Sequence, residues 1–136
     1  MKGHLIQKVF FNAKPNEIYS ILMDSKKHSI LTDSDAEIGK KRGDSFSVWG
    51  GSIRGNILEL EKNKKIVLSW NCESDGWPKD HFSHLEINLK EVEGGTLVTL
   101  KQKNIPIICL EEIDQGWYDY YWTPLRKKLP RGEFSK

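Results

Sequence analysis

Four residues near the middle of the chain belong to the types that bind metal ions. Cys72 and Glu73 end one strand-like segment, and His81 and His84 begin the next. Thiolate, carboxylate and imidazole groups are the usual ligands of zinc. His81 and His84 are three positions apart, so in an extended strand they point to opposite faces and cannot chelate together. We therefore expect no metal site, with His81 bonding locally near Asp80 and His84 facing solvent.

Acid–base catalysis by the adjacent pair Asp80 and His81 is a second possibility. Such a pair needs a third group to act on, and the sequence singles out none. The chain also lacks the motifs of a nucleophile elbow, a phosphate-binding loop and a metalloprotease helix. We expect no catalytic residue and no cofactor. An enzyme that uses residues inside a cavity, with no shared motif, is a weaker alternative than a binding protein.

The composition is that of an ordinary globular protein. The chain has 136 residues, of which 38% are hydrophobic and 29% charged, with a net charge of +2. This length predicts one domain over residues 1–136. So small a net charge gives no indication of a nucleic-acid partner. The basic runs at 40–42, 62–65 and 126–128 also lack the interleaved aromatic side chains that bind single strands.

No segment predicts a membrane anchor. Gln7 and Lys8 interrupt the N-terminal apolar residues before they reach the length of a signal peptide. The apolar run 105–110 is far shorter than the roughly 20 residues that cross a bilayer. Cys72 and Cys109 have neither zinc-ligand nor redox-motif spacing. We therefore expect two reduced thiols in a cytoplasmic protein.

The elements that must position these residues follow from the periodicity of the sequence. Residues 5–11 are rich in strand-forming types, and a helical pattern starts at Pro15. Asp24 is placed to cap a second short helix, so a helix–helix unit is expected over residues 15–31. Residues 34–103 then alternate in hydrophobicity between turns, most of which contain glycine. With the first strand this makes about seven strands in hairpin order, which predicts an antiparallel sheet.

From Leu110 onward the apolar period changes to that of a helix. Five of the six residues at 117–122 are aromatic, and their arc from Tyr120 to Trp122 spans roughly half of the helix circumference. A helix that rests on a flat surface has an apolar stripe of only about 100°. We therefore expect a sheet that curls around this helix and covers its aromatic side chains. Pro124 should kink the helix or end its regular part.

Four stretches carry a resemblance to a known family: NAKPNEIYSILMD at 12–24, GDSFSVWGGSIRGNILEL at 43–60, IVLSWNCESDGWPKDHFSHLEINL at 66–89, and IDQGWYDYYW at 113–122. They resemble the C-terminal domain of the activators of the 90-kDa heat-shock chaperone's ATPase. That domain belongs to the START-like, birch-pollen-allergen-like proteins. The resemblance covers residues from about 5 to 129. It implies an α+β helix-grip fold, in which a curved antiparallel sheet of about seven strands encloses a long C-terminal helix, with two short helices after the first strand.

The resemblance also implies a function. Such a protein is expected to be a non-enzymatic co-chaperone that contacts the 90-kDa heat-shock chaperone. It would favour the closed, hydrolysis-ready conformation by binding it preferentially. Full co-chaperones carry a further N-terminal domain, and this sequence opens close to the first strand. We therefore expect binding rather than strong stimulation of the chaperone.

The same superfamily often holds a small hydrophobic ligand between the sheet and the C-terminal helix, so a carrier or sensor is the alternative function. Bulky side chains could instead simply fill that space. The sequence is compatible with both a ligand-binding cavity and a filled core. The expected lining is Phe46, Val48, Ile53, Ile57, Leu68, Trp70, Leu85, Ile113, Trp117 and Tyr121.

Three tryptophans are candidates for contact with a partner protein. Trp49 continues the strand face of Ser45 and Ser47, which predicts an outward-facing ring. Trp77 lies in a polar loop, and Trp122 lies at the edge of the helix arc. Exposed tryptophans often contribute most of the binding energy at an interface. Each ring could instead fold back over the sheet.

The turn that contains Lys40, Lys41 and Arg42 is the remaining candidate surface. Basic runs of this kind are usually only solvated surface. As a contact surface, the turn could meet an acidic face of a chaperone. Such binding would weaken with increasing salt, because dissolved ions screen exposed charges.

Overall fold

A seven-stranded antiparallel sheet forms the frame of the molecule, in a computed structural model that describes residues 1–135. Its strand order is β1-β7-β6-β5-β4-β3-β2, so the first strand lies beside the last and the others follow as hairpins. The strands are β1 (Lys2–Phe11), β2 (Glu37–Ile38), β3 (Ser45–Val48), β4 (Ile53–Glu61), β5 (Lys65–Cys72), β6 (Ser83–Val92) and β7 (Gly95–Pro106).

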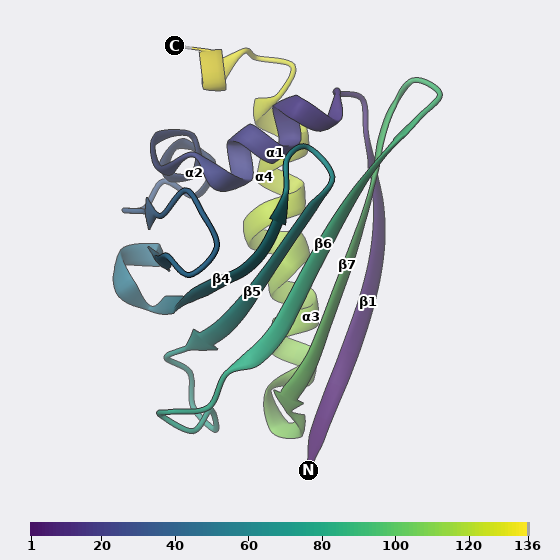
Figure 1. Cartoon of the computed structure of the whole chain (residues 1–136). Coiled ribbons are helices and arrows are strands. Elements are labelled where there is room, and N and C mark those ends of the chain that lie inside the picture. Colours follow the sequence, from purple (N-terminus) through teal and green to yellow (C-terminus); the bar gives the residue numbers. More distant parts are fainter. Residues whose placement is uncertain (136) are drawn as a thin grey trace.

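The helices follow the first and last strands, as the sequence predicts. The short helices α1 (Pro15–Met23) and α2 (Ser25–Thr32) come after β1. The C-terminal helix is built of α3 (Leu110–Trp117), the π-helical turn η3 (Tyr118–Trp122) and α4 (Thr123–Lys128). In Figure 1 the strands sweep past this helix, with α1 and α2 near its α4 end. The remaining 3-10 turns are η1 (Trp49–Gly51), η2 (Ile107–Cys109) and η4 (Glu133–Ser135).

The core lies between the concave face of the sheet and the helices. Alternate residues of β6 are buried, among them Leu85 and Ile87, and so are Val98 and Leu100 of β7. Period-two burial is what a strand with one face toward the core requires. The same core includes apolar residues of α1, such as Ile18, which is fully buried. The helix-grip arrangement implied by the resemblance is therefore confirmed.

The C-terminal helix changes its hydrogen bonding just before Pro124. The backbone N–H of Thr123 donates to the carbonyl of Tyr118, five residues earlier. Because Pro124 has no N–H to donate to Tyr120, the chain widens into a π turn there and then resumes as α4. The predicted irregularity at Pro124 is thus present, but the helix continues beyond it.

The prediction that the sheet covers all five aromatic residues of this helix is wrong for two of them. Trp117, Tyr121 and Trp122 are buried, with 5%, 6% and 1% of their surface exposed. Tyr118 and Tyr120 are 39% and 57% exposed. The sheet covers a narrower arc than the aromatic one, so the rings at its margin remain in solvent.

Two buried glutamines fix the helix against the sheet. On β7, Gln102 accepts a hydrogen bond of 2.9 Å from Nε1 of Trp117. On β1, Gln7 accepts one of 2.7 Å from Nε1 of Trp122 and donates one of 2.8 Å to the carbonyl of Asp114. Buried indole N–H groups need such partners. These pairs therefore determine both the rotation and the axial position of the helix.

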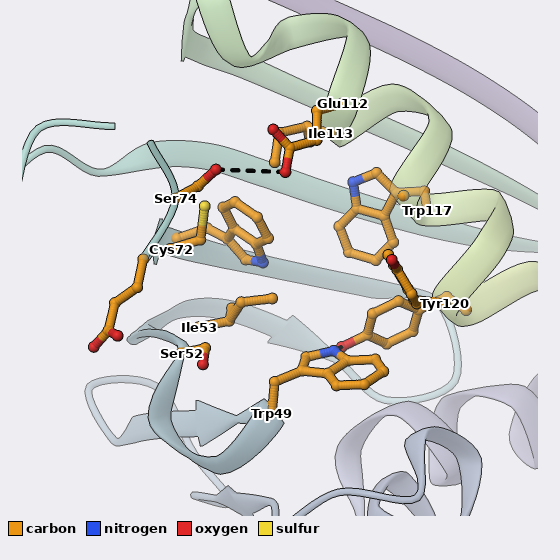
Figure 2. A pocket seen from close by; sticks show the side chains of 13 residues that line it. Trp49, Ser52, Ile53, Cys72, Ser74, Glu112, Ile113, Trp117 and Tyr120 are labelled. Atoms are coloured by element: carbon orange, nitrogen blue, oxygen red, sulfur yellow. Dashed lines mark hydrogen bonds between the residues drawn. The ribbon is translucent and has the colours of Figure 1, made fainter. Parts of the chain in front are cut away.

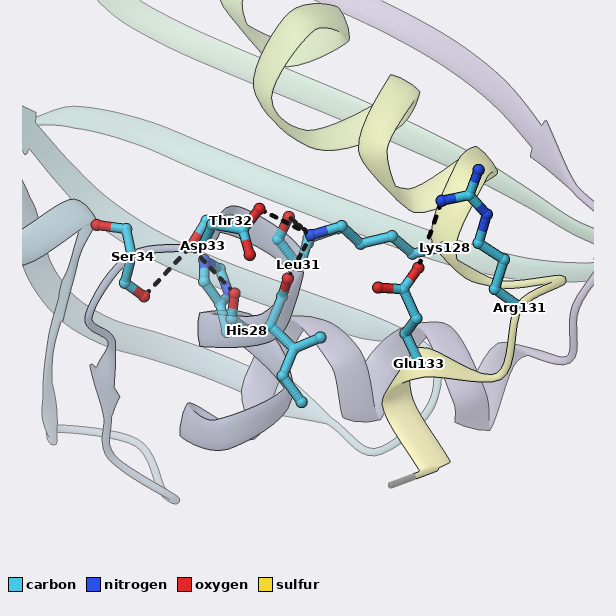
Figure 3. Close-up of polar contacts among 9 residues, drawn as sticks. His28, Leu31, Thr32, Asp33, Ser34, Lys128, Arg131 and Glu133 are labelled. Carbon is cyan, nitrogen blue, oxygen red and sulfur yellow. Dashed lines mark hydrogen bonds and ion pairs between the residues drawn. The ribbon is translucent and has the colours of Figure 1, made fainter.

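Lys128 joins the far end of the C-terminal helix to α2 (Figure 3). Its ammonium lies 2.6 Å from the carbonyl of Ile30 and 3.3 Å from that of Leu31. It also pairs with Asp33, at 3.2 Å. The last carbonyls of a helix have no partner within it and carry partial negative charge, so a cation there is stabilising.

Candidate functional site

A pocket of about 420 Å³ opens between η1, the end of β5 and the C-terminal helix (Figure 2). This volume lies within the range of small-molecule sites in proteins. Aromatic and aliphatic side chains make up much of its wall. The lining residues are Trp49, Ser52, Ile53, Trp70, Cys72, Glu73, Ser74, Glu112, Ile113, Gly116, Trp117, Tyr120 and Tyr121.

The aromatic rings of the pocket support one another. The rings of Trp70 and Trp117 lie 6.2 Å apart between centroids, one from the sheet and one from the helix. Trp49 makes an edge contact with Tyr120, with centroids 5.5 Å apart. Such tilted and edge-to-face pairs are favourable for aromatic rings. The wall is therefore held in place by both layers of the fold.

The hydroxyl of Tyr121 lies at the centre of a buried polar chain. It is 2.9 Å from Nε2 of His28 and 3.2 Å from Nε1 of Trp49. Nδ1 of His28 lies 3.0 Å from the carbonyl of Leu22, which can only accept, so Nδ1 carries the proton. Nε2 then accepts from the Tyr121 hydroxyl, and the Trp49 indole donates to that hydroxyl.

Burial determines the protonation states of His28 and Tyr121. Desolvation lowers the pKa of His28 and raises that of Tyr121, so both groups are neutral at pH 7. A protonated His28 would donate from both nitrogens, and the Tyr121 hydroxyl proton would then have no acceptor in the chain. The sequence analysis missed His28. Its spacing of three from Leu31 on the short helix was the available signal, since both side chains face the core.

Polar groups stand at the mouth of the pocket. A carboxylate oxygen of Glu112, on α3, lies 3.5 Å from the hydroxyl of Ser74, on the loop after β5. Glu73 pairs with Arg54 at 3.7 Å. Burial, with smaller contributions from the neighbouring Cys109 and Glu112, raises the pKa of the Cys72 thiol to about 12. That thiol is therefore neutral and is a poor nucleophile.

Of the ten predicted lining residues, five line this pocket, four others line a smaller hollow, and one lines neither. Five line the pocket: Ile53, Trp70, Ile113, Trp117 and Tyr121. A second hollow of only about 40 Å³ lies deeper, between the sheet and the helix. It is lined by Phe46, Val48, Leu68 and Leu85, together with Trp70, Trp117 and Tyr121. Ile57 is buried on β4 and lines neither. The deep interior is thus nearly filled, and the larger space lies toward the opening.

The predicted outward direction of Trp49 is wrong. The strand ends at Val48, and Trp49 adopts a left-handed backbone conformation with φ of 55°, followed by Gly50 and Gly51 with positive φ. Strand alternation no longer applies once the chain turns, so the ring folds inward and bonds to Tyr121. Trp49 is a wall of the pocket.

The other two tryptophans proposed as partner contacts are buried, whereas Trp49 is only partly buried. Trp77 is 7% exposed, packs 5.5 Å from the ring of Trp70 and donates to the carbonyl of His81 at 2.9 Å. Trp122 is 1% exposed. The N–H of each indole has an internal acceptor, which is the carbonyl of His81 for Trp77 and the side chain of Gln7 for Trp122. Lys40, Lys41 and Arg42, by contrast, are exposed.

Neither histidine of the 81–84 segment behaves as predicted. His81 precedes β6 rather than lying in it, and its Nε2 is 2.6 Å from the carbonyl of Asn104, a distant partner rather than a local one. His84 is half-buried, and its Nδ1 has no hydrogen-bond partner among the described residues. Within residues 1–135, no three His, Cys, Asp or Glu side chains are grouped to hold a metal ion.

Across residues 1–135, the helices are too short or too polar to span a membrane. Cys72 and Cys109 are free thiols, and both are buried.

The sequence and the fold both match known proteins. Residues 12–129 match the family described as "Activator of Hsp90 ATPase homolog 1-like protein". The chain is 31% identical over 119 residues to activator of 90 kDa heat shock protein ATPase homolog 2 of Mus musculus, covering 88% of this chain and 35% of the relative. Homolog 1 of Homo sapiens is 26% identical over 125 residues, covering 92% and 36%. The chain thus spans about a third of the length of these curated relatives.

Solved structures also match this fold. A crystal structure of an HSP90 activator from Plasmodium falciparum superposes with a TM-score of 0.83 at 25% identity, covering 96% of each chain. Protein MLL2253 from Mesorhizobium loti superposes with a TM-score of 0.81 at 18% identity, covering 94% of this chain and 97% of that one, which bears on the fold alone. Because the family match covers residues 12–129, well over half of the chain, the chain belongs to the activator of Hsp90 ATPase homolog 1-like family.

Proposed function

We propose that this chain is a non-enzymatic binding protein that contacts a 90-kDa heat-shock chaperone. The observation that carries the proposal is its similarity, over 88% of its length, to a protein named as an activator of that chaperone's ATPase. The proposed action is preferential binding to the closed, hydrolysis-ready chaperone, which shifts the conformational equilibrium toward that state. Two free cysteines are typical of a reducing compartment, so the proposed location is the cytoplasm.

The turn at residues 40–42 is the proposed contact surface. Its three cationic side chains are exposed. The carboxylate of Asp44 accepts hydrogen bonds from the backbone of Lys40 and Lys41, at 3.0 and 3.2 Å, and so holds the turn in one shape. A rigid cationic turn fits an acidic partner surface at a low entropic cost.

A calorimetric titration into the chaperone of the same organism, with a non-hydrolysable nucleotide, tests this proposal. We expect micromolar affinity that falls as salt is raised, since exposed charges are screened. The double substitution Lys40→Gln and Lys41→Gln should weaken binding by about tenfold or more, whereas the same change of charge at Lys62 and Lys64, on the β4–β5 turn, should have little effect. An absence of binding at any salt concentration would refute the chaperone proposal.

The pocket supports a second candidate function, which is the carriage or sensing of a small hydrophobic ligand. A space of about 420 Å³ lined by three tryptophans and two tyrosines is suited to an apolar molecule. The neutral probe 4-phenylbutan-1-ol tests it, because binding in the pocket should change the fluorescence of Trp49, Trp70 and Trp117. A saturable change would support the pocket as a ligand site. No change up to the solubility limit would count against it.

A further inference from the structure

The pocket has a charge opposite to that of the molecule. The chain carries a net charge of +2, yet among residues 1–135 the only formally charged ones that line the pocket are the carboxylates Glu73 and Glu112. Glu73 already pairs with Arg54. Glu112 enters no ion pair among the described residues, and its side-chain contact across the mouth is the neutral hydroxyl of Ser74. A negative charge therefore stands at the mouth without a cation to balance it.

Two further features keep this charge in place and extend its effect. Glu112 lies in the first turn of α3, where its side chain interacts favourably with the positive end of the helix dipole. The pocket is also lined by the rings of Trp70, Trp117 and Tyr120, whose faces carry negative electrostatic potential and attract cations. The Cys72 thiol, which lines the same space, is neutral. The charged and aromatic groups of the lining thus favour a cation over an anion.

The arrangement in Figure 2 gives the order of these contacts. Glu112 and Ser74 lie on one side of the hollow, and Trp49 and Tyr120 lie on the other, with Ile53 between them and Trp117 along the helix. A molecule that met Glu112 with one end would extend over apolar and aromatic surface with the rest.

We propose that the pocket selects an amphipathic cation, an apolar or aromatic molecule that carries a single amine. The ammonium pairs with Glu112 at the mouth, and the apolar part lies against Ile53, Trp70 and Trp117. This inference rests on the second candidate function, the binding of a small molecule in the pocket, and names the chemical class of that molecule. It is independent of contact with the chaperone.

Three probes that share a phenylbutyl body and differ in charge test the inference: 4-phenylbutylamine, 4-phenylbutan-1-ol and 4-phenylbutyrate. Calorimetry at low salt should show the amine binding about tenfold more tightly than the alcohol, with the carboxylate weakest. The advantage of the amine should shrink as salt is raised.

Glu112→Gln and Glu111→Gln form a matched pair of variants. Both residues are exposed in the first turn of α3, but only Glu112 lines the pocket. Glu112→Gln should remove most of the amine's advantage, with a much smaller effect on the affinity for the alcohol than on that for the amine, whereas Glu111→Gln should alter neither affinity. Thermal unfolding of both variants checks that they remain folded.

The outcomes separate the inference from the function on which it rests. Equal affinity for the amine and the alcohol, or an unchanged advantage in Glu112→Gln, would overturn charge selection and leave the pocket as a ligand site. Binding of none of the three probes would overturn both. A stepwise loss from amine to alcohol to carboxylate that depends on Glu112 would establish the inference.

Discussion

At the scale of single residues, the most informative group is the chain His28–Tyr121–Trp49. These residues come from α2, the π turn of the C-terminal helix and η1. Their hydrogen bonds of 2.9 and 3.2 Å satisfy all the polar atoms that the Tyr121 side chain presents to the core. Each donor in this group has an acceptor only while His28 is neutral. The hydrogen bonding of Tyr121 and Trp49, which line the pocket, therefore depends on the protonation state of the buried imidazole.

Because of this hydrogen-bonded group, we expect the protein to lose stability on mild acidification. Burial lowers the pKa of His28 in the folded state, whereas the unfolded chain binds a proton with the ordinary pKa of about 6.5. The contribution of neutral His28 is therefore complete above about pH 6.5 and is lost as the pH falls toward the lowered folded pKa. Denaturant unfolding at about pH 7.5 and about pH 5.5 should show a lower free energy of unfolding at the acidic value.

Two histidine variants assign this effect. In His28→Gln, the difference in free energy of unfolding between the two pH values should be smaller than in the parent. His4→Gln, at an exposed position of β1, should keep the parent's difference. Equal differences in all three proteins would contradict the assignment to His28.

At the scale of elements, the contact between the C-terminal helix and the sheet depends on two polar pairs within an apolar interface. Gln102 is fully buried and makes two hydrogen bonds through its side chain, accepting from Trp117 and donating to Ser83 at 3.0 Å. Gln7 holds Trp122 in the same way from the edge strand β1. Apolar packing alone would permit several rotations of the helix, and these directional bonds select one.

We therefore expect Gln102→Met to destabilise the protein. Methionine has a similar volume, but it leaves the buried N–H of Trp117 without an acceptor, at a cost of about 1–3 kcal/mol in the free energy of unfolding. Gln115→Met, on the exposed side of α3, should cost less than about 0.5 kcal/mol. Urea denaturation measures both values. A cost for Gln102→Met no greater than that for Gln115→Met would show that the hydrogen bond to Trp117 contributes nothing to stability.

At the scale of the whole molecule, the fold separates a closed interior from an accessible pocket. The deep hollow is about 40 Å³, which leaves room for little more than solvent, whereas the pocket near the opening is about 420 Å³. Cys72 is a buried residue in the lining of the pocket, and Cys109 is buried at the start of the C-terminal helix. Both thiols have a raised pKa, chiefly because of burial.

The two cysteines can therefore report on opening of the fold. A thiol-specific disulfide reagent at pH 8 should modify the native protein at least about a hundredfold more slowly than the urea-unfolded chain. Cys72→Ala and Cys109→Ala variants, each with one remaining thiol, assign the rates. A molecule bound in the pocket should protect Cys72 further. Modification of the native protein at the unfolded rate would mean that the core around these thiols is open in solution.

The outline of the fold could be predicted from the sequence because it depends on local periodicity. Alternation in residues 83–92 and the helical period after Leu110 are properties of each segment alone, and they set the strand and helix types. The wide aromatic arc further indicated a sheet that curls around the helix. Strand alternation put Ile53 and Trp70 on inward faces, and the helical period did so for Ile113, Trp117 and Tyr121; all five line the pocket.

The features that could not be predicted lie mostly where the backbone leaves regular strand or helix geometry. Trp49 turned inward because the strand ends one residue earlier, and Tyr118 and Tyr120 face solvent because the sheet covers only part of the aromatic arc. His28 meets Tyr121 across 93 positions of sequence, a pairing that no local pattern carries. Local sequence was enough to assign the elements and most of their core faces, since these depend on neighbours a few residues away. The open pocket and its unbalanced carboxylate were decided by tertiary packing, because they arise only where η1, β5 and α3 approach one another in space.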